Sequence, residues 1–219
     1  MRGQILLEAT DENLDRVVQA LRDDPNVAYF HPNGVCHIDR VPDDPQFGEL
    51  YGLHNEGQTG GTVDADIDAP EAWEMTVGSR DIVVGVIDTG VDYSHMDLAD
   101  NMWTNPGEIP DNGLDDDENG FIDDVHGYDF VNDDGDPRDD HYHGTHVAGT
   151  IGASGNNGIG VVGVNWQVSI VALKFLNARG SGTTDGAIRA VNYATMMREL
   201  YGVNIRLTSN SWGGGGYSE

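Results

Sequence analysis

Three histidines stand within six residues in the segment DHYHGTHVAGTIGA, residues 140–153. The spacing of His141, His143 and His146 matches the His-x-His-x-x-His pattern of some zinc sites, and a neighbouring aspartate could add a carboxylate ligand. One imidazole in such a segment could instead act as a general base, because histidine exchanges its proton near neutral pH. The residue types alone leave both kinds of chemistry open.

Asp88 is the second candidate for chemistry. It follows Ile82 to Ile87, an apolar run without alternation that predicts a strand covered on both faces. In open parallel sheets, functional groups gather at the carboxyl ends of the strands. A carboxylate there loses solvent and needs a hydrogen-bond donor or a cation. The simpler interpretation is an aspartate that begins a turn with Thr89 and Gly90.

Two long motifs carry a family resemblance. VGVIDTGVDYSHMDL at residues 84–98 resembles the aspartate motif of the subtilisin-like serine proteases, and HGTHVAGT at residues 143–150 resembles their histidine motif. The resemblance implies that Asp88 orients His143, which takes a proton from a serine hydroxyl. It disfavours zinc, because Gly144-Thr145 replaces the acidic residue of such zinc enzymes. We then expect His146 to be buried and hydrogen-bonded.

The same resemblance implies bound calcium. NNGIGVVGV at residues 156–164 is similar to the family's calcium loop, and DDDENGFIDD at residues 115–124 begins like an EF-hand loop, although His126 replaces its final glutamate. The alternatives are an ordinary glycine-rich turn and a solvated acidic loop. The implied ligands of the first site are Asp44 or Gln46, Asp97, Asn157, Ile159 and Val161; those of the second are Asp115, Asp117, Asn119 and Asp123.

Two glycine-rich segments resemble the backbone segments that hold an extended substrate in this family. They are LNARGSG at residues 176–182 and SNSWGG at residues 209–214. Their glycines leave room for main-chain pairing with a polypeptide substrate. Trp212 is expected to line a specificity pocket. The implied substrate-binding residues are Gly180, Ser181, Gly182, Ser211, Trp212 and Gly213.

The family's nucleophile has no counterpart in this sequence. Family members carry it in a Gly-Thr-Ser-x-Ala type motif, preceded by an oxyanion-hole asparagine in an Ala-Gly-Asn type segment, and neither motif occurs here. We therefore expect the front part of a longer serine endopeptidase, inactive by itself. A non-catalytic calcium-stabilised or peptide-binding module on the same scaffold is the alternative.

The order of predicted elements sets the fold class. Residues 1–41 are predicted to form a strand at 4–7, a helix ending before Pro25, a strand at 26–30 and a linker; they resemble the end of a propeptide that inhibits its own protease. Residues 42–219 alternate strands and helices, with a calcium-loop insert near 101–140, which contains twelve aspartates. The prediction is an α/β fold: an incomplete, subtilisin-like, doubly wound parallel sheet behind a small α+β propeptide remnant.

Composition excludes several function classes. The formal net charge is -27, from 38 acidic and 11 basic residues, which argues against nucleic acids and anionic membranes as partners. Such an excess of carboxylates favours bound divalent cations or a salty habitat. Cys36 is the only cysteine, so an internal disulfide is excluded, and Cys36-His37 is a poor nucleophile pair because adjacent residues rarely align. No signal-peptide pattern or apolar run of membrane-spanning length occurs, and the resemblance implies a secreted or extracellular protein.

Overall fold

The structure, a computed structural model, describes residues 7, 9–10, 13–31 and 40–214, and the chain divides into units 1–38 and 39–219. In the first unit, the predicted helix is α1 (Leu14–Asp23), none of whose residues is buried. The strand predicted at 26–30 is wrong: Val27 closes a turn by bonding to the Asp24 carbonyl, and residues 27–30 are irregular. The strand predicted at 4–7 falls mainly outside the described residues.

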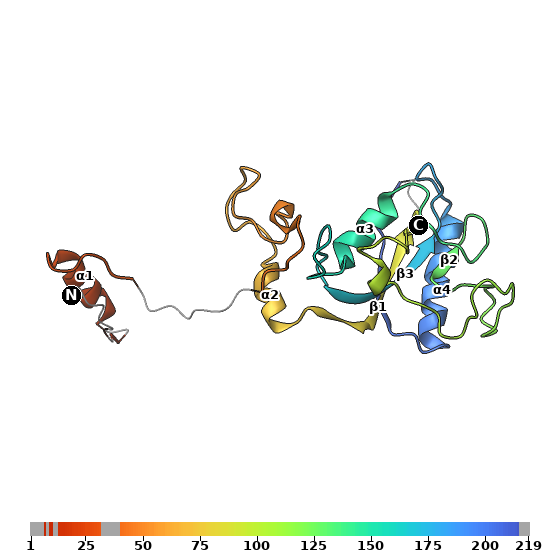
Figure 1. Ribbon diagram of the computed structural model, residues 1–219, viewed down its shortest axis with the longest axis horizontal. Helices are drawn as coiled ribbons and strands as arrows, with labels where there is room; N and C mark the ends of the chain where they lie inside the picture. The colour runs from red at the N-terminus through yellow and green to blue at the C-terminus, as the bar shows by residue number, and fades with distance from the viewer. Residues whose placement is uncertain (1–6, 8, 11–12, 32–39, 215–219) are drawn as a thin grey trace. The chain divides into compact units, whose positions relative to one another are not determined.

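A four-stranded parallel sheet is the centre of the second unit (Figure 1). Its strands are β1 (Gly78–Asp88), β2 (Gly127–Asp129), β3 (Gln167–Lys174) and β4 (Ile205–Ser209), in the order β2-β3-β1-β4. The register places Asp88 opposite Lys174 on β3, and Val86 opposite Ser209 on β4. The sheet therefore brings the ends of β1, β3 and β4 to one edge.

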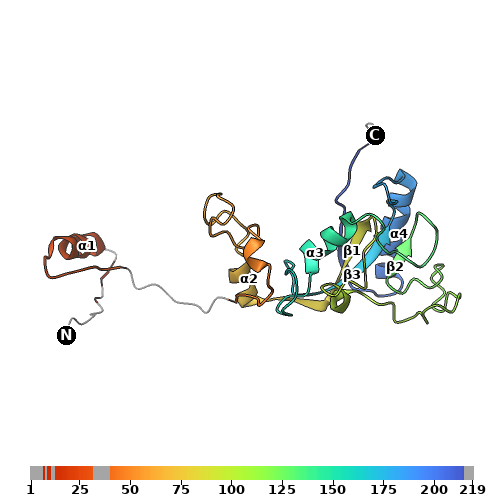
Figure 2. The ribbon, with the colours of Figure 1, turned by 45° about the horizontal axis from the view of Figure 1, so that its top comes forward.

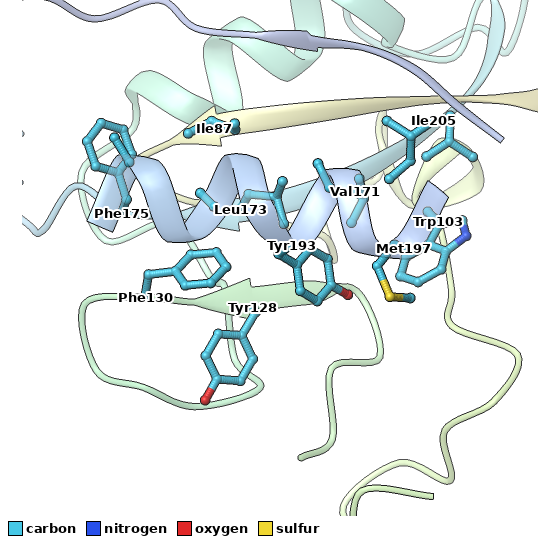
Figure 3. Packing of buried hydrophobic residues seen from close by; sticks show 14 of the residues in the cluster. Ile87, Trp103, Tyr128, Phe130, Val171, Leu173, Phe175, Tyr193, Met197 and Ile205 are labelled. Carbon is cyan, nitrogen blue, oxygen red and sulfur yellow. The ribbon is translucent and has the colours of Figure 1, made fainter. Parts of the chain in front are cut away.

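Different helices cover the two faces of the sheet, as Figure 2 shows with α3 (His143–Gly152) and α4 (Thr184–Glu199) on either side of β1 and β3. Alternate residues of the strands enter two apolar clusters, which explains why β1 is apolar without alternation. The α3 side contains Val84, Val86, Ala148, Ile170 and Ala172. The α4 side, drawn in Figure 3, contains Ile87, Val171, Leu173, Tyr193 and Met197. The doubly wound parallel sheet is thus confirmed.

Strand β2 was not predicted, because it is three residues long and lies inside the acid-rich segment 101–140. It pairs with β3, and Gly127 makes this possible: a Cβ there would lie 1.9 Å from the Ala172 carbonyl oxygen. Gly127 also has a φ of 122°, which favours glycine. The surrounding loop-forming residues conceal so short a strand in the sequence.

A third cluster packs around Trp73 of α2 (Ala69–Met75), a helix with a proline in its first turn. The Trp73 indole donates a hydrogen bond to the Val164 carbonyl at 2.9 Å, and its ring meets Trp166 edge-on. This cluster ties residues 47–73 to the loop that follows α3. Short 3-10 helices occur at Phe47–Glu49 and Ala99–Asn101. Across the described residues, every helix is too short or too polar to cross a bilayer.

Candidate active site

Strand β1 and helix α3 bring an aspartate and a histidine together. Asp88 is the last residue of β1, and His143 is the first residue of α3. The imidazole Nδ1 of His143 lies 2.8 Å from Oδ1 of Asp88. The Asp88 side chain is 1% exposed and that of His143 is 41% exposed. A buried carboxylate therefore holds an imidazole that other molecules can reach.

The hydrogen bonds of Asp88 are unequally shared between its oxygens. Oδ1 accepts from His143 and also from the Thr89 backbone N at 2.7 Å, whereas Oδ2 is buried without a partner among the described residues. An incompletely satisfied buried carboxylate gains from a positive charge beside it. The arrangement therefore fixes the orientation of the imidazole, which a general base requires.

Two glycines set the position of His143. A Cβ at Gly144 would lie 2.0 Å from the Gly90 carbonyl oxygen, and a Cβ at Gly90 would lie 2.4 Å from that of Pro137. The Gly144 backbone N also donates to Thr89 Oγ1 at 2.9 Å. Because α3 begins where backbone touches backbone, its first residue is fixed against the end of β1.

Asp139 joins the same two elements by side-chain hydrogen bonds. Its Oδ1 accepts from Thr89 Oγ1 at 2.9 Å, and its Oδ2 accepts from the backbone N and Oγ1 of Thr145 at 2.9 and 2.6 Å. Burial raises the pKa of Asp139, but the hydrogen bonds from Thr145 and from the backbone of residues 141, 142 and 145 outweigh it and lower the pKa. Sequence reasoning missed this residue; its one signal is a carboxylate just before a helix start.

The other two histidines lie apart from this contact. The His141 ring stacks on that of Tyr142, with centroids 4.4 Å apart, and its Nε2 lies 3.4 Å from where a Cβ of Gly180 would be. His146 is exposed, so the expectation that it is buried is wrong. The reason is that α3 turns Ala148 toward the sheet, and residues two positions apart on a helix point about 200° from each other. The three histidines therefore do not converge as zinc ligands.

The predicted substrate segments border one groove of about 580 Å³. The Trp212 ring meets Phe175 at 4.7 Å, and its Nε1 donates to the Ile87 carbonyl at 2.9 Å, one residue before Asp88. The groove therefore reaches the end of β1. Its lining includes Gly180, Ser181, Gly182, Ile188, Val191, Trp212 and Gly213. Ser211 does not line it; its Oγ lies 3.5 Å from Ser209 Oγ.

The residues predicted for the first calcium site meet at the loop after α3. Asp97 is 2% exposed; its Oδ1 accepts from Asn157 Nδ2 and its Oδ2 from the Val161 backbone N, both at 2.9 Å. The Ile159 backbone N donates to Asn157 Oδ1 at 2.8 Å. On the other side of the loop, Asp44 Oδ2 accepts from the Asn156 backbone N at 2.6 Å. Asp44 Oδ1 is buried without a partner in the described part of the chain, and burial raises the pKa of Asp44.

In the acid-rich insert, Glu108 joins Asp115 and Asp117, with one carboxylate oxygen of each within 4.8 Å of the others. Burial raises the pKa of Glu108, and the charges of Asp116 and Asp117 add to the shift. The EF-hand-like spacing could not indicate Glu108, because it precedes the first position of that pattern. Three carboxylates in such proximity are a donor set that suits a hard divalent cation.

Asn119 and Asp123, also predicted as ligands, bond within the protein. Asn119 Nδ2 donates to Asp124 Oδ2 at 2.9 Å, and the two oxygens of Asp123 accept from the backbone of residues 112 and 113. Asp124 is fully buried and accepts a hydrogen bond from Tyr193 of α4, which anchors the insert to the core. Burial raises the pKa of Asp124 to about 6.

Comparison with known proteins finds proteases among the relatives of this chain. The subtilase family model matches residues 79–219. Subtilisin-like protease 1 of Plasmodium vivax is 46% identical over 120 residues, 54% of this chain and 19% of the relative. The thermophilic serine proteinase of Bacillus sp. (strain AK1) is 35% identical over 83% of this chain and 37% of its own length. The halolysin-like extracellular serine protease Nep of Natrialba magadii is 31% identical over 85% of this chain and 29% of its own length.

This chain thus spans between a fifth and two fifths of the length of these relatives. Among solved structures, the Aeromonas sobria serine protease, crystallised in complex with the chaperone ORF2, superimposes with a TM-score of 0.59 at 23% identity. The match covers 80% of this chain and 26% of that protein. It shows a shared fold, in agreement with the predicted subtilisin-like α/β sheet.

Proposed function

Because this chain belongs to the subtilase family, we propose that Asp88 and His143 are two members of an Asp-His-Ser triad that hydrolyses peptide bonds. The 2.8 Å contact between His143 Nδ1 and Asp88 Oδ1 carries the proposal. Asp88 keeps the proton on Nδ1, so Nε2 takes the proton of a serine hydroxyl as its oxygen attacks the peptide carbonyl. His143 then returns that proton to the leaving amine, and the serine is left acylated.

We infer that these 219 residues do not complete the reaction alone. The sequence lacks the Gly-Thr-Ser-x-Ala and Ala-Gly-Asn type motifs that would supply the serine and the oxyanion-hole asparagine. Ser211 and Ser154 are poor substitutes, because Ser211 belongs to a proposed substrate segment and Ser154 is 6% exposed in the loop after α3. Hydrolysis therefore needs a nucleophile from a segment that carries those motifs.

The proposed substrates are polypeptides bound in extended form. Gly180, Ser181 and Gly182 would pair with one side of the substrate main chain, and residues 211–213 with the other. The groove between them supports this assignment, because it passes Trp212, whose indole is bonded one residue before Asp88. Trp212 would form a wall against which one substrate side chain packs.

Calcium is the proposed cofactor, and its role is to stabilise loops. Asp44, Asp97 and Asn157 would supply side-chain oxygens at the first site, and Ile159 and Val161 their carbonyls. The buried Oδ1 of Asp44, which has no hydrogen-bond partner among the described residues, supports this site. At the second site, Glu108 would join Asp115 and Asp117, with Asn119 and Asp123 in supporting positions.

Residues 1–41 are proposed as the end of a propeptide that inhibits the peptidase unit, residues 42–219, before it is removed. The proposal is supported by the resemblance of this segment to subtilase propeptides. An extracellular location is proposed for the whole protein, because the related Nep protease is named as extracellular. A synthetic peptide of residues 1–41 should slow peptide hydrolysis by a completed enzyme.

The test of function supplies the missing nucleophile. The full chain is fused to the part of the Bacillus relative that follows the matched region, and a fluorophosphonate probe reports an activated serine. We expect labelling that His143→Ala abolishes and that His54→Ala, a control far from Asp88 in sequence and stacked on Phe47, preserves. A folded fusion that binds peptides without being labelled would contradict the peptidase and indicate a peptide-binding module.

A further inference from the structure

Lys174 is the only lysine in the chain, and its side chain is 2% exposed although 38 acidic residues could attract it to the surface. It is the last residue of β3 and stands opposite Asp88 in the register of the sheet. Burying an ammonium group costs several kcal/mol unless acceptors surround it. The identity of its acceptors therefore indicates what the residue does.

The ammonium of Lys174 has three N–H donors, and each finds an oxygen that accepts its hydrogen bond. Nζ donates to the Thr89 carbonyl at 2.6 Å, to the Leu176 carbonyl at 3.1 Å and to Asp140 Oδ1 at 2.6 Å. Its hydrogen-bonding capacity is therefore filled. An apolar residue would satisfy none of these acceptors, and two of them are backbone groups that cannot turn elsewhere.

Each acceptor belongs to a different part of the proposed active site. Thr89 follows Asp88, Leu176 begins the first substrate segment, and Asp140 lies three residues before His143. The Asp88 carbonyl adds to this junction by accepting from the backbone N of Phe175 at 3.0 Å and of Leu176 at 3.2 Å. One side chain thus joins the acid, the base and the substrate segment.

We propose that Lys174 is a positioning residue: through Asp140 and the Thr89 carbonyl, it fixes the loop before His143 to the turn after Asp88. Its meaning for catalysis rests on the proposed function. Lys174 differs from Asp139, which joins β1 to α3 but makes no hydrogen bond to β3 among the described residues. A merely structural lysine would support the sheet without changing the contact between Asp88 and His143.

The distinguishing measurement is the exchange rate of the His143 Nδ1 proton with water, observed by NMR as a downfield imidazole resonance of the full chain. Asp140→Asn weakens the ion pair between Lys174 and Asp140. Because the Asp140 side chain is 49% exposed, the variant should still fold. We expect exchange to become roughly two- to fivefold faster, the effect of losing a partly exposed ion pair. Asp133→Asn is the matched control, because it breaks the Arg189–Asp133 pair on the surface.

Lys174→Met removes all three ties and should accelerate exchange at least about tenfold, as expected for lost charged hydrogen bonds. Arg189→Met is its control and should leave the rate unchanged. An unchanged rate in folded Asp140→Asn overturns the proposal, and so does an unchanged rate in folded Lys174→Met. If Lys174→Met does not fold, the comparison of Asp140→Asn with Asp133→Asn decides alone.

This experiment needs no catalysis, so it separates the two proposals. If the fusion is not labelled but Asp140→Asn still accelerates proton exchange in the 219-residue chain, the proposed peptidase activity is contradicted and the positioning role of Lys174 is kept. If the fusion is labelled but Asp140→Asn leaves the exchange rate unchanged, the proposed peptidase activity is kept and the positioning role of Lys174 is contradicted.

Discussion

His143 Nδ1 lies 2.8 Å from Asp88 Oδ1, although the two residues are 55 positions apart in the sequence. The contact joins the end of a strand to the start of a helix across an acid-rich insert. Its supports are the close approach of Gly144 to Gly90 and the hydrogen bonds of Asp139. Because these supports are separate groups, each can be removed by itself.

Gly144→Ala should loosen the contact and destabilise the chain. The added Cβ would lie 2.0 Å from a backbone oxygen, and such overpacking costs about 1–3 kcal/mol. Gly149→Ala in the same helix meets nothing within 4 Å and should stabilise by up to about 1 kcal/mol. Urea unfolding of both variants checks this, and equal changes in the free energy of unfolding would contradict the role assigned to Gly144.

Asp88→Asn in the fused enzyme should slow fluorophosphonate labelling by about four orders of magnitude, because an amide no longer favours the productive imidazole tautomer. Asp81→Asn is the control, since Asp81 is an exposed residue of the same strand. The labelling rate constants of the two variants are compared under identical conditions. Similar rates would show that Asp88 does not act on the base.

Removing calcium with a chelator should lower the melting temperature. A ligand present at a hundred times its dissociation constant stabilises the folded state by about 2.7 kcal/mol. Asp97→Asn should reduce the calcium-dependent part of the shift, whereas Asp100→Asn, at a neighbouring exposed position, should retain it. A melting temperature that does not respond to chelation would contradict both proposed calcium sites.

Asp139 should make the protein acid-sensitive. Its pKa is lowered in the folded state, so the unfolded state binds more protons in acid. The stability it contributes is present above about pH 4, the usual range of an aspartate, and is lost as the pH falls through the folded-state pKa. Asp139→Asn should reduce stability at neutral pH and flatten its decline below about pH 4, measured by denaturant unfolding.

Asp124 should change the pH dependence of stability in the direction opposite to that of Asp139. Its pKa is raised to about 6, so the folded state binds the proton more tightly than the unfolded state does. Stability should therefore fall as the pH rises from about 4 to 6, by at most about 3 kcal/mol. Asp124→Asn should remove this slope in metal-free buffer. An unchanged slope would mean that another group is responsible.

The sequence could predict the elements whose local pattern is strong. The apolar run at residues 82–87 predicted a strand covered on both faces, and β1 is that strand. Strand β2 shows the limit of such patterns, because a strand of three residues forms only where a partner such as β3 is available. Local composition cannot supply that information.

The candidate site likewise contains residues that the sequence could predict and residues that it could not. Asp88 could be placed at a strand end, and the resemblance paired it with His143. Glu108, Asp139 and the ties of Lys174 could not be predicted, because the fold chooses which donors a carboxylate meets. The bond from Trp212 to the Ile87 carbonyl, across 125 residues, is a contact of this kind.

Strand β1 is hydrogen-bonded on both sides, to β3 and β4, and is covered by a helix on each face. Opening such a strand requires disrupting the whole sheet. The carboxylate of the pair is therefore the fixed reference. Any adjustment to an incoming peptide must come from the exposed substrate segments, because Lys174 also holds the loop before His143 to this junction.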